Sequence, residues 1–381
     1  MRDVDACGTV LKDGRGTRKI AARSTNAKRP GLAVGGGSGN NCREARLRRG
    51  ALMAHKVMGI CAGRKDGNGE IAVKAALKVL QDKGAEVEMI NLFDYNILPC
   101  TGCEGCTMQM GNIAMGKQKE YKGCILKNKD DVDALVTELH TCNGVIIAVP
   151  TYDLAPSSMY MRFAQRFLAY ELSFLKEIGV VKEDPHTVAG LIAVGGSMHD
   201  WQPLALEVIQ ASMFTMSITP VDRMMLQRVG RPANILIDDN ADQLARAKEM
   251  GEHIWEAMET PVEDRKWLGD PNDGVCPNCH SSLVYPGDKH WDGVEFPYEC
   301  AVCGCGGTMG TNPETGRPML VIDPENGHIR DRFIDKSRAE HLNEIVQTRI
   351  NFMQKQGEIK DDLAKYKALS FPCPVKPAAQ A

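Results

Sequence analysis

The sequence predicts an α/β fold built on a doubly wound parallel sheet of five strands, followed by a small four-cysteine domain and a C-terminal helix. Segments of strand length and segments of helical spacing alternate five times. The apolar run at 144–149 has the length and composition of a strand buried on both faces. Two close pairs of cysteines between residues 276 and 303 predict the second domain.

The α/β elements begin at residue 56. A short apolar strand, 56–61, precedes a polar turn rich in glycine, and 70–83 then carries apolar side chains at helical spacing up to Gly84. The alternating segment 86–92 is expected to be the second strand. The other expected strands are 144–149, 188–194 and 217–221, and the other expected helices are 132–139, 160–174, 204–214 and 239–258.

Composition excludes two classes of protein. The chain has 381 residues and a net charge of −3, and no apolar run approaches the ~20 residues that cross a bilayer. We therefore expect neither an integral membrane protein nor a uniformly basic nucleic-acid-binding protein. Seven of the fourteen cysteines lie in C-x2-C steps, which is typical of metal or cluster ligation and indicates a reducing, cytoplasmic setting.

Basic residues are concentrated at the start of the chain. Residues 1–54 contain twelve Lys or Arg and four Asp or Glu without a periodic apolar pattern, so we expect a disordered basic extension. A transit peptide or RNA-binding arm is one interpretation. A start assigned too far upstream is the other, since Met53 directly precedes the first strand. We assign this segment no function.

The loop after the first strand, 63–69, has the features of a phosphate site. Backbone amides meet a helix N-terminus there, Arg64 and Lys65 add positive charge, and Asn68 is a further donor. The spacing matches neither G-x-G-x-x-G nor a P-loop, which favours a single phosphate, as on a mononucleotide. A glycine-rich turn without a ligand is the alternative.

Two further loops should meet this one, because the carboxyl ends of parallel strands share an edge of the sheet. Their backbone amides can approach a flat ring that Tyr152 or Trp201 covers. Tyr152 alone is equally consistent with a packed loop aromatic, and Trp201 with a surface anchor. The candidate residues are Pro150, Thr151, Tyr152, Asp153 and Leu154 after the third strand, and Gly195, Gly196 and Ser197 after the fourth.

These loops, together with Pro99-Cys100-Thr101-Gly102-Cys103-Glu104-Gly105-Cys106, resemble the flavodoxin-like NADPH-dependent FMN reductases and, among them, the iron–sulfur flavoproteins. The resemblance covers about residues 56–258. It implies a flavodoxin-like fold, bound FMN, NAD(P)H as donor and a homo-oligomer. The family's first loop commonly runs Ser-Pro-Arg and then Gly-Asn-Thr; Ala62 and Gly69 replace its two hydroxyl residues here. In this family, 150–154 borders the isoalloxazine ring and 195–197 is a second flavin loop.

The cysteine motif of this family implies a [4Fe–4S] cluster. Cys100, Cys103 and Cys106 form C-x2-C-x2-C, and Cys124 is the fourth thiolate that such a cluster requires. The intervening segment 107–123 is longer than in the family, and we expect it to bulge outward. The alternatives are that the three cysteines bind nothing or supply reactive thiols near the flavin.

A metal-ribbon domain is expected over 271–325. Cys276, Cys279, Cys300 and Cys303 have the spacing of a closed tetrahedral site. A segment of this size cannot build a sufficient core without a metal, so the site is expected to be structural. Zinc is favoured because His280 follows Cys279 where a rubredoxin usually has glycine. A rubredoxin-like iron that carries electrons to the flavin is the alternative, and Cys305 is a substitute ligand. No basic aromatic face accompanies the ribbon, so nucleic-acid binding is not expected.

The charged segment 330–370 is expected to be a helical tail that docks on the body of the chain or on a neighbouring subunit, and 372–381 is expected to be disordered.

Together these features predict an FMN-dependent oxidoreductase. It would pass electrons from NAD(P)H, or from a reduced ferredoxin-like carrier through the cluster, to a small acceptor such as a quinone, free flavin, nitroaromatic or oxygen. No side chain is assigned as an acid or base. Two rivals stay open: an electron carrier without a dedicated substrate, and a non-enzymatic scaffold whose flavin site has lost its hydroxyl groups.

Overall fold

The computed structural model describes residues 55–372. The expected disorder of the basic segment 1–54 and of the final residues, 373–381, falls outside the described part of the chain.

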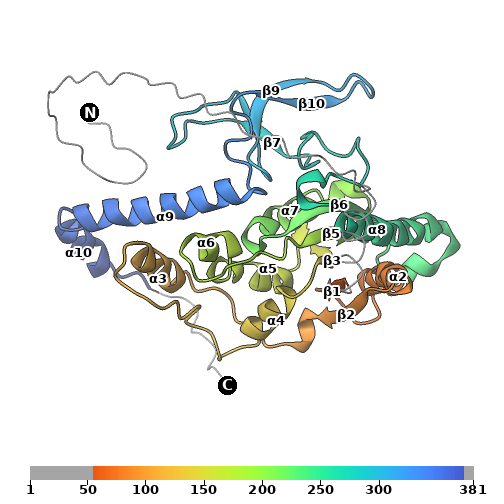
Figure 1. Cartoon of the computed structure of the whole chain (residues 1–381), viewed down its shortest axis with the longest axis horizontal. Coiled ribbons are helices and arrows are strands. Elements are labelled where there is room, and N and C mark those ends of the chain that lie inside the picture. The colour runs from red at the N-terminus through yellow and green to blue at the C-terminus, as the bar shows by residue number, and fades with distance from the viewer. Residues whose placement is uncertain (1–54, 373–381) are drawn as a thin grey trace, which may run out of the picture. The chain divides into compact units, whose positions relative to one another are not determined.

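Five parallel strands form the central sheet in the order β2-β1-β3-β5-β6 (Figure 1). This is the doubly wound, flavodoxin-like arrangement that the sequence predicts. The strand order reverses between β1 and β3, where such sheets bind their ligands. The strands are β1 (Lys56–Cys61), β2 (Glu86–Asn91), β3 (Gly144–Tyr152), β5 (Val188–Val194) and β6 (Thr219–Leu226), with a short antiparallel β4 (Ala155–Pro156) beside β3.

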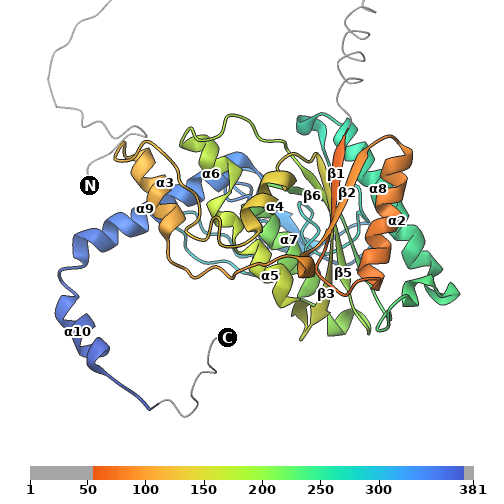
Figure 2. The same cartoon turned by 90° about the horizontal axis from the view of Figure 1, so that it is seen from below.

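Helices cover both faces of this sheet, as Figure 2 shows. Successive side chains of β3 point to opposite faces: Val145 and Ile147 pack with one set of helices, and Ile146 packs with the other. A strand that is apolar at every position therefore has a core on each side. The helices are α2 (Asn68–Asp82) and α8 (Ala241–Glu259) on one face, and α4 (Val132–Leu139), α5 (Ser158–Ala164) and α7 (Ala205–Met216) on the other.

The expected helix 160–174 is wrong as a single element. The chain instead forms α5, a short 3-10 turn at Phe167–Ala169 and α6 (Leu172–Glu177). Arg166 lies at the break, where its buried guanidinium forms an ion pair with Asp130. Glu171 then starts α6 because its carboxylate accepts hydrogen bonds from the first-turn amides. The ion pair joins residues that are far apart in the sequence, and the Glu171 contact is a helix cap. The spacing of apolar residues reveals neither of them.

The expected outward bulge at 107–123 is partly wrong as well, because its first half belongs to the helix α3 (Gly105–Ala114). Met110 of α3 is fully buried and packs with Phe174 of α6 and Leu342. Leu342 belongs to α9 (Asp335–Lys355), the first tail helix, which therefore docks on the body of its own chain. The second tail helix, α10 (Lys360–Ala368), has no buried residue.

The four-cysteine domain forms a second, antiparallel sheet in the order β10-β9-β8-β7 (Figure 1). Its strands are β7 (Val284–Pro286), β8 (Tyr298–Cys300), β9 (Gly306–Thr311) and β10 (Pro318–Ile322). Buried Val302 and Leu320 join its five cysteines in a cluster too small for an ordinary core. The cysteines therefore have to contribute to holding this domain together.

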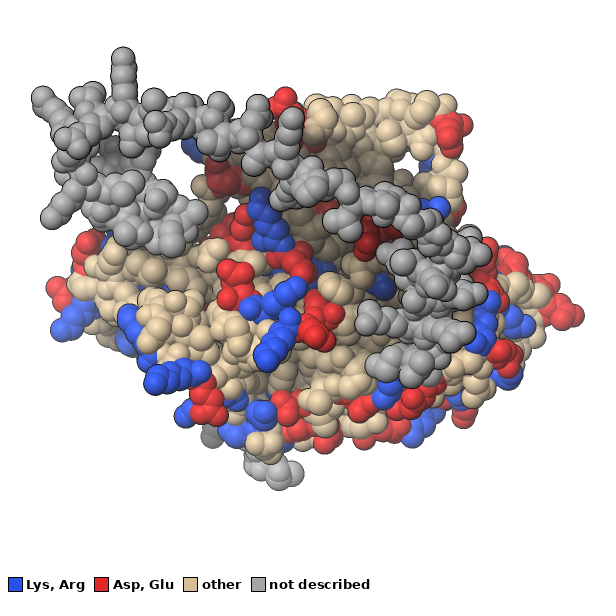
Figure 3. All heavy atoms as spheres, in the orientation of Figure 1, with Lys and Arg blue, Asp and Glu red and all other residues tan. Residues whose placement is uncertain are grey.

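Helix apolarity and surface charge can both be compared with the composition of the sequence. In the described part of the chain, no helix combines the length and apolarity needed to cross a membrane. On the face drawn in Figure 3, basic and acidic side chains of the described residues are intermixed rather than gathered by sign of charge.

Close packing of α2 against α8 depends on Gly251. A Cβ atom built there would lie 2.6 Å from the carbonyl oxygen of Ala76, and backbone cannot move aside as a side chain can. We expect Gly251→Ala to lower the free energy of unfolding by about 1–3 kcal/mol, measured by urea denaturation. Gly357→Ala is the control, because no atom lies within 4 Å of its added Cβ. Equal effects of the two substitutions would contradict this account of the helix contact.

Candidate functional site

A crevice of about 220 Å³ opens at the carboxyl ends of β1, β3 and β5. Most of the residues that the sequence predicts to bind a cofactor, from three separate loops, meet in this crevice. Among the expected residues, its lining includes Arg64, Asn68, Pro150, Thr151, Tyr152, Gly195 and Gly196. Lys65, Asp153, Leu154 and Ser197 lie outside that lining.

Glycines permit the close approach of the loops at the crevice. A Cβ atom at Gly195 would collide with the buried side chain of Gln202, and one at Gly196 would lie 3.0 Å from the backbone of Gly230. Gln202 is itself fixed by hydrogen bonds with Thr151 (3.2 Å) and the carbonyl oxygen of Leu226 (3.1 Å). Glycine is thus required where the loops approach one another, and a ligand can reach main-chain groups directly.

The N-terminus of α2 supplies free donors to the crevice. Its cap residue, Gly67, provides no side-chain hydrogen bond, so the amides of the first turn have no partner within the helix. These amides and the positive end of the helix dipole favour an anion. Glu70 also lines the crevice, but its carboxylate pairs with Lys74 at 2.6 Å, which offsets its charge.

Asn68 has a different role from the one expected. Its amide nitrogen donates to the carbonyl oxygens of Val229 and Arg231, both at 2.7 Å, and its oxygen accepts from the Ile235 amide at 3.0 Å. These three bonds use both hydrogens of the side-chain amide and its oxygen, and all three are made to other groups of the protein. Asn68 therefore fixes the loop after β6 against the start of α2.

Lys65 also faces away from the crevice, since its ammonium group pairs with Asp94 at 2.6 Å on the surface. Arg64 is the cationic side chain of this loop that lines the crevice. Of these two residues, Arg64 is therefore the one that can contact an anion in the crevice directly. The charge of Lys65 would act on the anion only at longer range.

The loop after β6 is the part of the crevice that sequence reasoning missed. Val229, Gly230 and Pro232 line it, and Asn68 holds this loop in place. The signal in the sequence is the Gly230-Arg231-Pro232 turn, which three residues separate from the end of β6 at Leu226. The expected strand ended earlier, at residue 221.

Two of the loops that form the crevice, those after β3 and β5, also carry exposed apolar side chains, and we call them the rim loops. Tyr152, which lines the crevice, is 52% exposed. Trp201 is 65% exposed, and Leu154, Met198 and Leu204 are also exposed. The amide of Leu204 donates to the carbonyl oxygen of Leu154 at 3.3 Å, which joins the two rim loops.

The four cysteines expected to hold a cluster come from α3 and its flanking loops. Cys100 and Cys103 are exposed, whereas Cys106 and Cys124 are half-buried. Burial raises the pKa of the Cys106 thiol, and the charges of Cys124 and Cys100 raise this pKa further. Among the described residues, no three of these four sulfurs lie within 4.8 Å of one another, the spacing of a single-ion site.

Arg166 connects Cys124 to the protein interior. Its guanidinium donates to the Cys124 sulfur at 3.5 Å and to the carbonyl oxygen of Leu98 at 2.9 Å, while Asp130 compensates its charge. This buried cation holds both the loop before Cys100 and the loop after α3.

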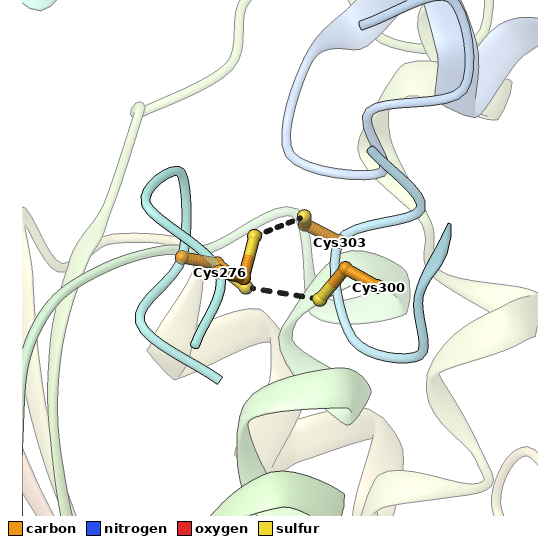
Figure 4. A group of neighbouring side chains, drawn as sticks. Cys276, Cys300 and Cys303 are labelled. Carbon is orange, nitrogen blue, oxygen red and sulfur yellow. Dashed lines mark hydrogen bonds between the residues drawn. The ribbon is translucent and has the colours of Figure 1, made fainter. Parts of the chain in front are cut away.

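The ribbon cysteines lie in the geometry of a tetrahedral metal site. The sulfurs of Cys276 and Cys303 are 3.6 Å apart and those of Cys279 and Cys300 are 3.5 Å apart, as the dashed lines in Figure 4 mark. Tetrahedral Zn–S bonds of about 2.3 Å place sulfurs roughly 3.8 Å apart. All four cysteines are buried, so the site is closed, and these residues fit a structural zinc.

A buried polar network fastens the ribbon to α7. Arg223 of β6 bonds Glu207 (3.1 Å) and Gln210 (2.9 Å) of α7 and Asp273 (2.7 Å) of the ribbon. Glu207 also accepts from the Ser281 hydroxyl at 2.6 Å, next to the first cysteine pair. Because α7 begins just after the Gly195–Gln202 loop, the ribbon supports the helix that follows the crevice.

Comparison with known proteins gives a family match for the α/β domain. Residues 55–226 match the family described as NADPH-dependent FMN reductase. Iron–sulfur flavoproteins are similar over this part: one from Methanocaldococcus jannaschii is 28% identical over 155 residues, which is 40% of this chain and 69% of that protein. One from Archaeoglobus fulgidus is 34% identical over 116 residues, 30% of this chain and 46% of its own.

Two other proteins are similar over most of the chain. A flavone synthase of Aspergillus candidus is 25% identical over 334 residues, covering 81% of this chain and 95% of that protein. A solved structure of a flavone reductase superposes with a TM-score of 0.60 at 22% identity, covering 84% of this chain and all of that one. These matches are longer than the α/β domain, so they extend beyond it.

The Arg223 network yields a stability prediction. Arg223→Met leaves Glu207 buried without its cation, so we expect the free energy of unfolding to fall by about 3–5 kcal/mol. Urea denaturation of the zinc-loaded protein measures this change. The matched control is Arg317→Met, which removes an exposed guanidinium from the same domain and should alter stability by no more than about 0.5 kcal/mol. A loss below about 1 kcal/mol for Arg223→Met would mean that the network does not fasten the ribbon.

Proposed function

We propose that this chain, whose α/β domain belongs to the NADPH-dependent FMN reductase family, is an FMN-dependent oxidoreductase that passes electrons from NAD(P)H to a planar aromatic acceptor. The observation that carries the proposal is the crevice at the switch point of the sheet. Amides of a helix N-terminus and one arginine meet there with glycine backbone and an apolar rim.

The residues present suit FMN. The crevice is smaller than the ~300–1,000 Å³ of a typical ligand pocket, so it can enclose only part of such a ligand. Arg64 and the first-turn amides of α2 would hold the phosphate, which restores donors that the missing hydroxyl groups would have given. Gly195 and Gly196 would let backbone approach the ring, and Tyr152 would cover it. When bound, the flavin supplies hydride and single-electron chemistry.

The rim favours a flat, apolar acceptor over a charged one. Tyr152 lines the crevice, and Trp201 and Met198 are exposed on the loop after β5, which also contributes Gly195 and Gly196 to the crevice. The two proteins that are similar over most of the chain are named for flavone chemistry, and a flavone is a planar aromatic ketone. Flavones and quinones share a flat conjugated carbonyl group, so we propose this class as the acceptor.

Electron carriage through an iron–sulfur cluster is the second candidate function. The similarity to iron–sulfur flavoproteins and the C-x2-C-x2-C spacing of Cys100, Cys103 and Cys106 favour it. Here the four cysteines would hold a [4Fe–4S] cluster, and a ferredoxin-like protein would replace the small acceptor. A homo-oligomer of this chain is part of either proposal.

Absorption spectra and turnover of anaerobically purified protein test these functions. An oxidised flavin spectrum and NAD(P)H oxidation that depends on a flavone or a quinone are expected for the oxidoreductase. Flavin and cluster absorption without such turnover would favour the carrier. A protein that stays colourless and fails to quench FMN fluorescence after reconstitution would contradict both.

Removing the guanidinium from the crevice should weaken FMN binding. A hydrogen bond to a charged group contributes about 1.5–3 kcal/mol, so Arg64→Ala should raise the FMN Kd about tenfold or more in a fluorescence-quenching titration. Lys78→Ala removes the same charge from the exposed part of α2, where Lys78 pairs with Asp82, and should leave the Kd nearly unchanged. If both substitutions raised the Kd equally, the weaker FMN binding would come from the change in overall charge and not from a lost contact in the crevice.

Removing the rim aromatic should affect the acceptor but not the flavin. Aromatic stacking contributes about 0.5–1.5 kcal/mol, so Trp201→Ala should raise KM for a flavone or quinone about two- to tenfold. FMN affinity and reduction of ferricyanide, which needs no apolar platform, should change little. Trp291→Ala is the control, since that tryptophan is equally exposed but lies in the ribbon. An unchanged KM would remove Trp201 from the acceptor site.

A further inference from the structure

Beside the ribbon site lies a second group of metal-ligating side chains, composed of Cys305, His328 and Asp331. Their ligand atoms all lie within 4.8 Å of one another. Cys305 follows the second cysteine pair and precedes β9, and the other two residues lie on the loop after β10. Sequence analysis treated Cys305 as a substitute ligand for the ribbon, but its sulfur instead lies 3.4 Å from His328 Nδ1.

The arrangement of this group points to a shared ion rather than to a hydrogen-bonded relay. In a thiol–imidazole–carboxylate relay the two partners occupy opposite ring nitrogens. Here Cys305 Sγ (3.4 Å) and Asp331 Oδ2 (3.5 Å) both approach the same nitrogen, Nδ1 of His328. One ring nitrogen has a single proton or lone pair and cannot bond both partners.

The distances also fit a tetrahedral ion. Bonds of about 2.0–2.3 Å from zinc to nitrogen, oxygen and sulfur place neighbouring ligand atoms roughly 3.3–3.8 Å apart. The two measured separations lie in this range. We propose that Cys305, His328 and Asp331 bind a second Zn²⁺ ion, separate from the ion of the four-cysteine site.

The surroundings hold these ligands in place. The Asp331 carboxylate accepts hydrogen bonds from Asn278 Nδ2 (2.8 Å) and from the Phe333 amide (3.0 Å), the kind of outer contact that orients metal ligands. Backbone hydrogen bonds from Gly306 to Gly327 (2.9 Å) and from Arg332 to Cys303 (2.8 Å) flank the group. The loop after β10 is thereby fixed against the cysteine knuckle on both sides.

Access and ligand chemistry agree with zinc. Cys305 and Asp331 are buried, whereas His328 is 56% exposed and gives an ion a path from solvent. One sulfur, one nitrogen and one oxygen suit a borderline ion such as Zn²⁺ better than Mg²⁺ or Ca²⁺. Three protein ligands leave a fourth position for water, as in zinc sites that are not purely structural.

The second ion would connect the ribbon to the tail. The loop that carries His328 and Asp331 leads directly into α9, and the Ser337 hydroxyl of that helix donates to the Ile329 carbonyl oxygen at 3.0 Å. Binding of the ion would therefore fix the start of the helix that docks on α3 and α6.

Zinc content of the full chain tests the proposal. Each protein is incubated with excess Zn²⁺ and desalted, and its zinc is counted by elemental analysis, with iron counted separately. We expect His328→Ala to hold one equivalent of zinc less than the wild type. The matched control is His290→Ala, a ribbon histidine that bonds Glu299 and should keep the wild-type content. Equal zinc content in the wild type and His328→Ala would overturn the proposal.

Two further measurements separate this site from the four-cysteine site. In cobalt-substituted protein, His328→Ala should lose the absorption of a site with one thiolate and retain that of the four-thiolate site. Hydrogen exchange should quicken in the loop after β10 and at the start of α9. Loss of the four-thiolate absorption instead would show that His328 merely supports the ribbon, and would also overturn the proposal.

Discussion

Parallel pairing of β1, β3 and β5 brings three loops that are far apart in the sequence to one edge of the sheet. The main chains of these loops then have to approach one another, and Gly195 and Gly196 permit that approach because a Cβ atom would collide with Gln202 or come close to Gly230. The crevice is therefore a product of backbone geometry. The hydrogen-bond donors that it offers to an anion are mainly the backbone amides at the start of α2, and these do not depend on side-chain hydroxyl groups.

The metal ribbon contributes to this edge from a distance. Its cysteines provide a compact centre for a domain with little apolar core, and the Arg223 network transmits that rigidity to α7. The buried charges of Arg223 and Glu207 compensate one another, and the partly exposed carboxylate of Asp273 gives the guanidinium a second partner. A metal bound by the four cysteines would thus stabilise the helix that follows the crevice without touching a ligand there.

The relatives fall into two groups by the length of chain that they match. The iron–sulfur flavoproteins match over 155 and 116 residues, which is shorter than the α/β domain. The flavone synthase and the flavone reductase match 81% and 84% of the chain, so this similarity extends beyond the α/β domain. The presence of both groups is the reason to test both an aromatic acceptor and a cluster.

Local sequence determined the elements that are periodic and self-contained. Helix 132–139 and strand 188–194 have the predicted bounds, and the spacing of Cys276 to Cys303 indicated a four-cysteine site, because these patterns depend on near neighbours. Tertiary contacts decided the rest. Arg166 pairs with Asp130 at the point where a predicted helix is interrupted. The side chain of Asn68 bonds the loop after β6, although the sequence suggested a phosphate contact. Cys305 lies beside His328 of the loop after β10. Each of these pairs joins residues more than twenty positions apart, and no local pattern specifies such a meeting.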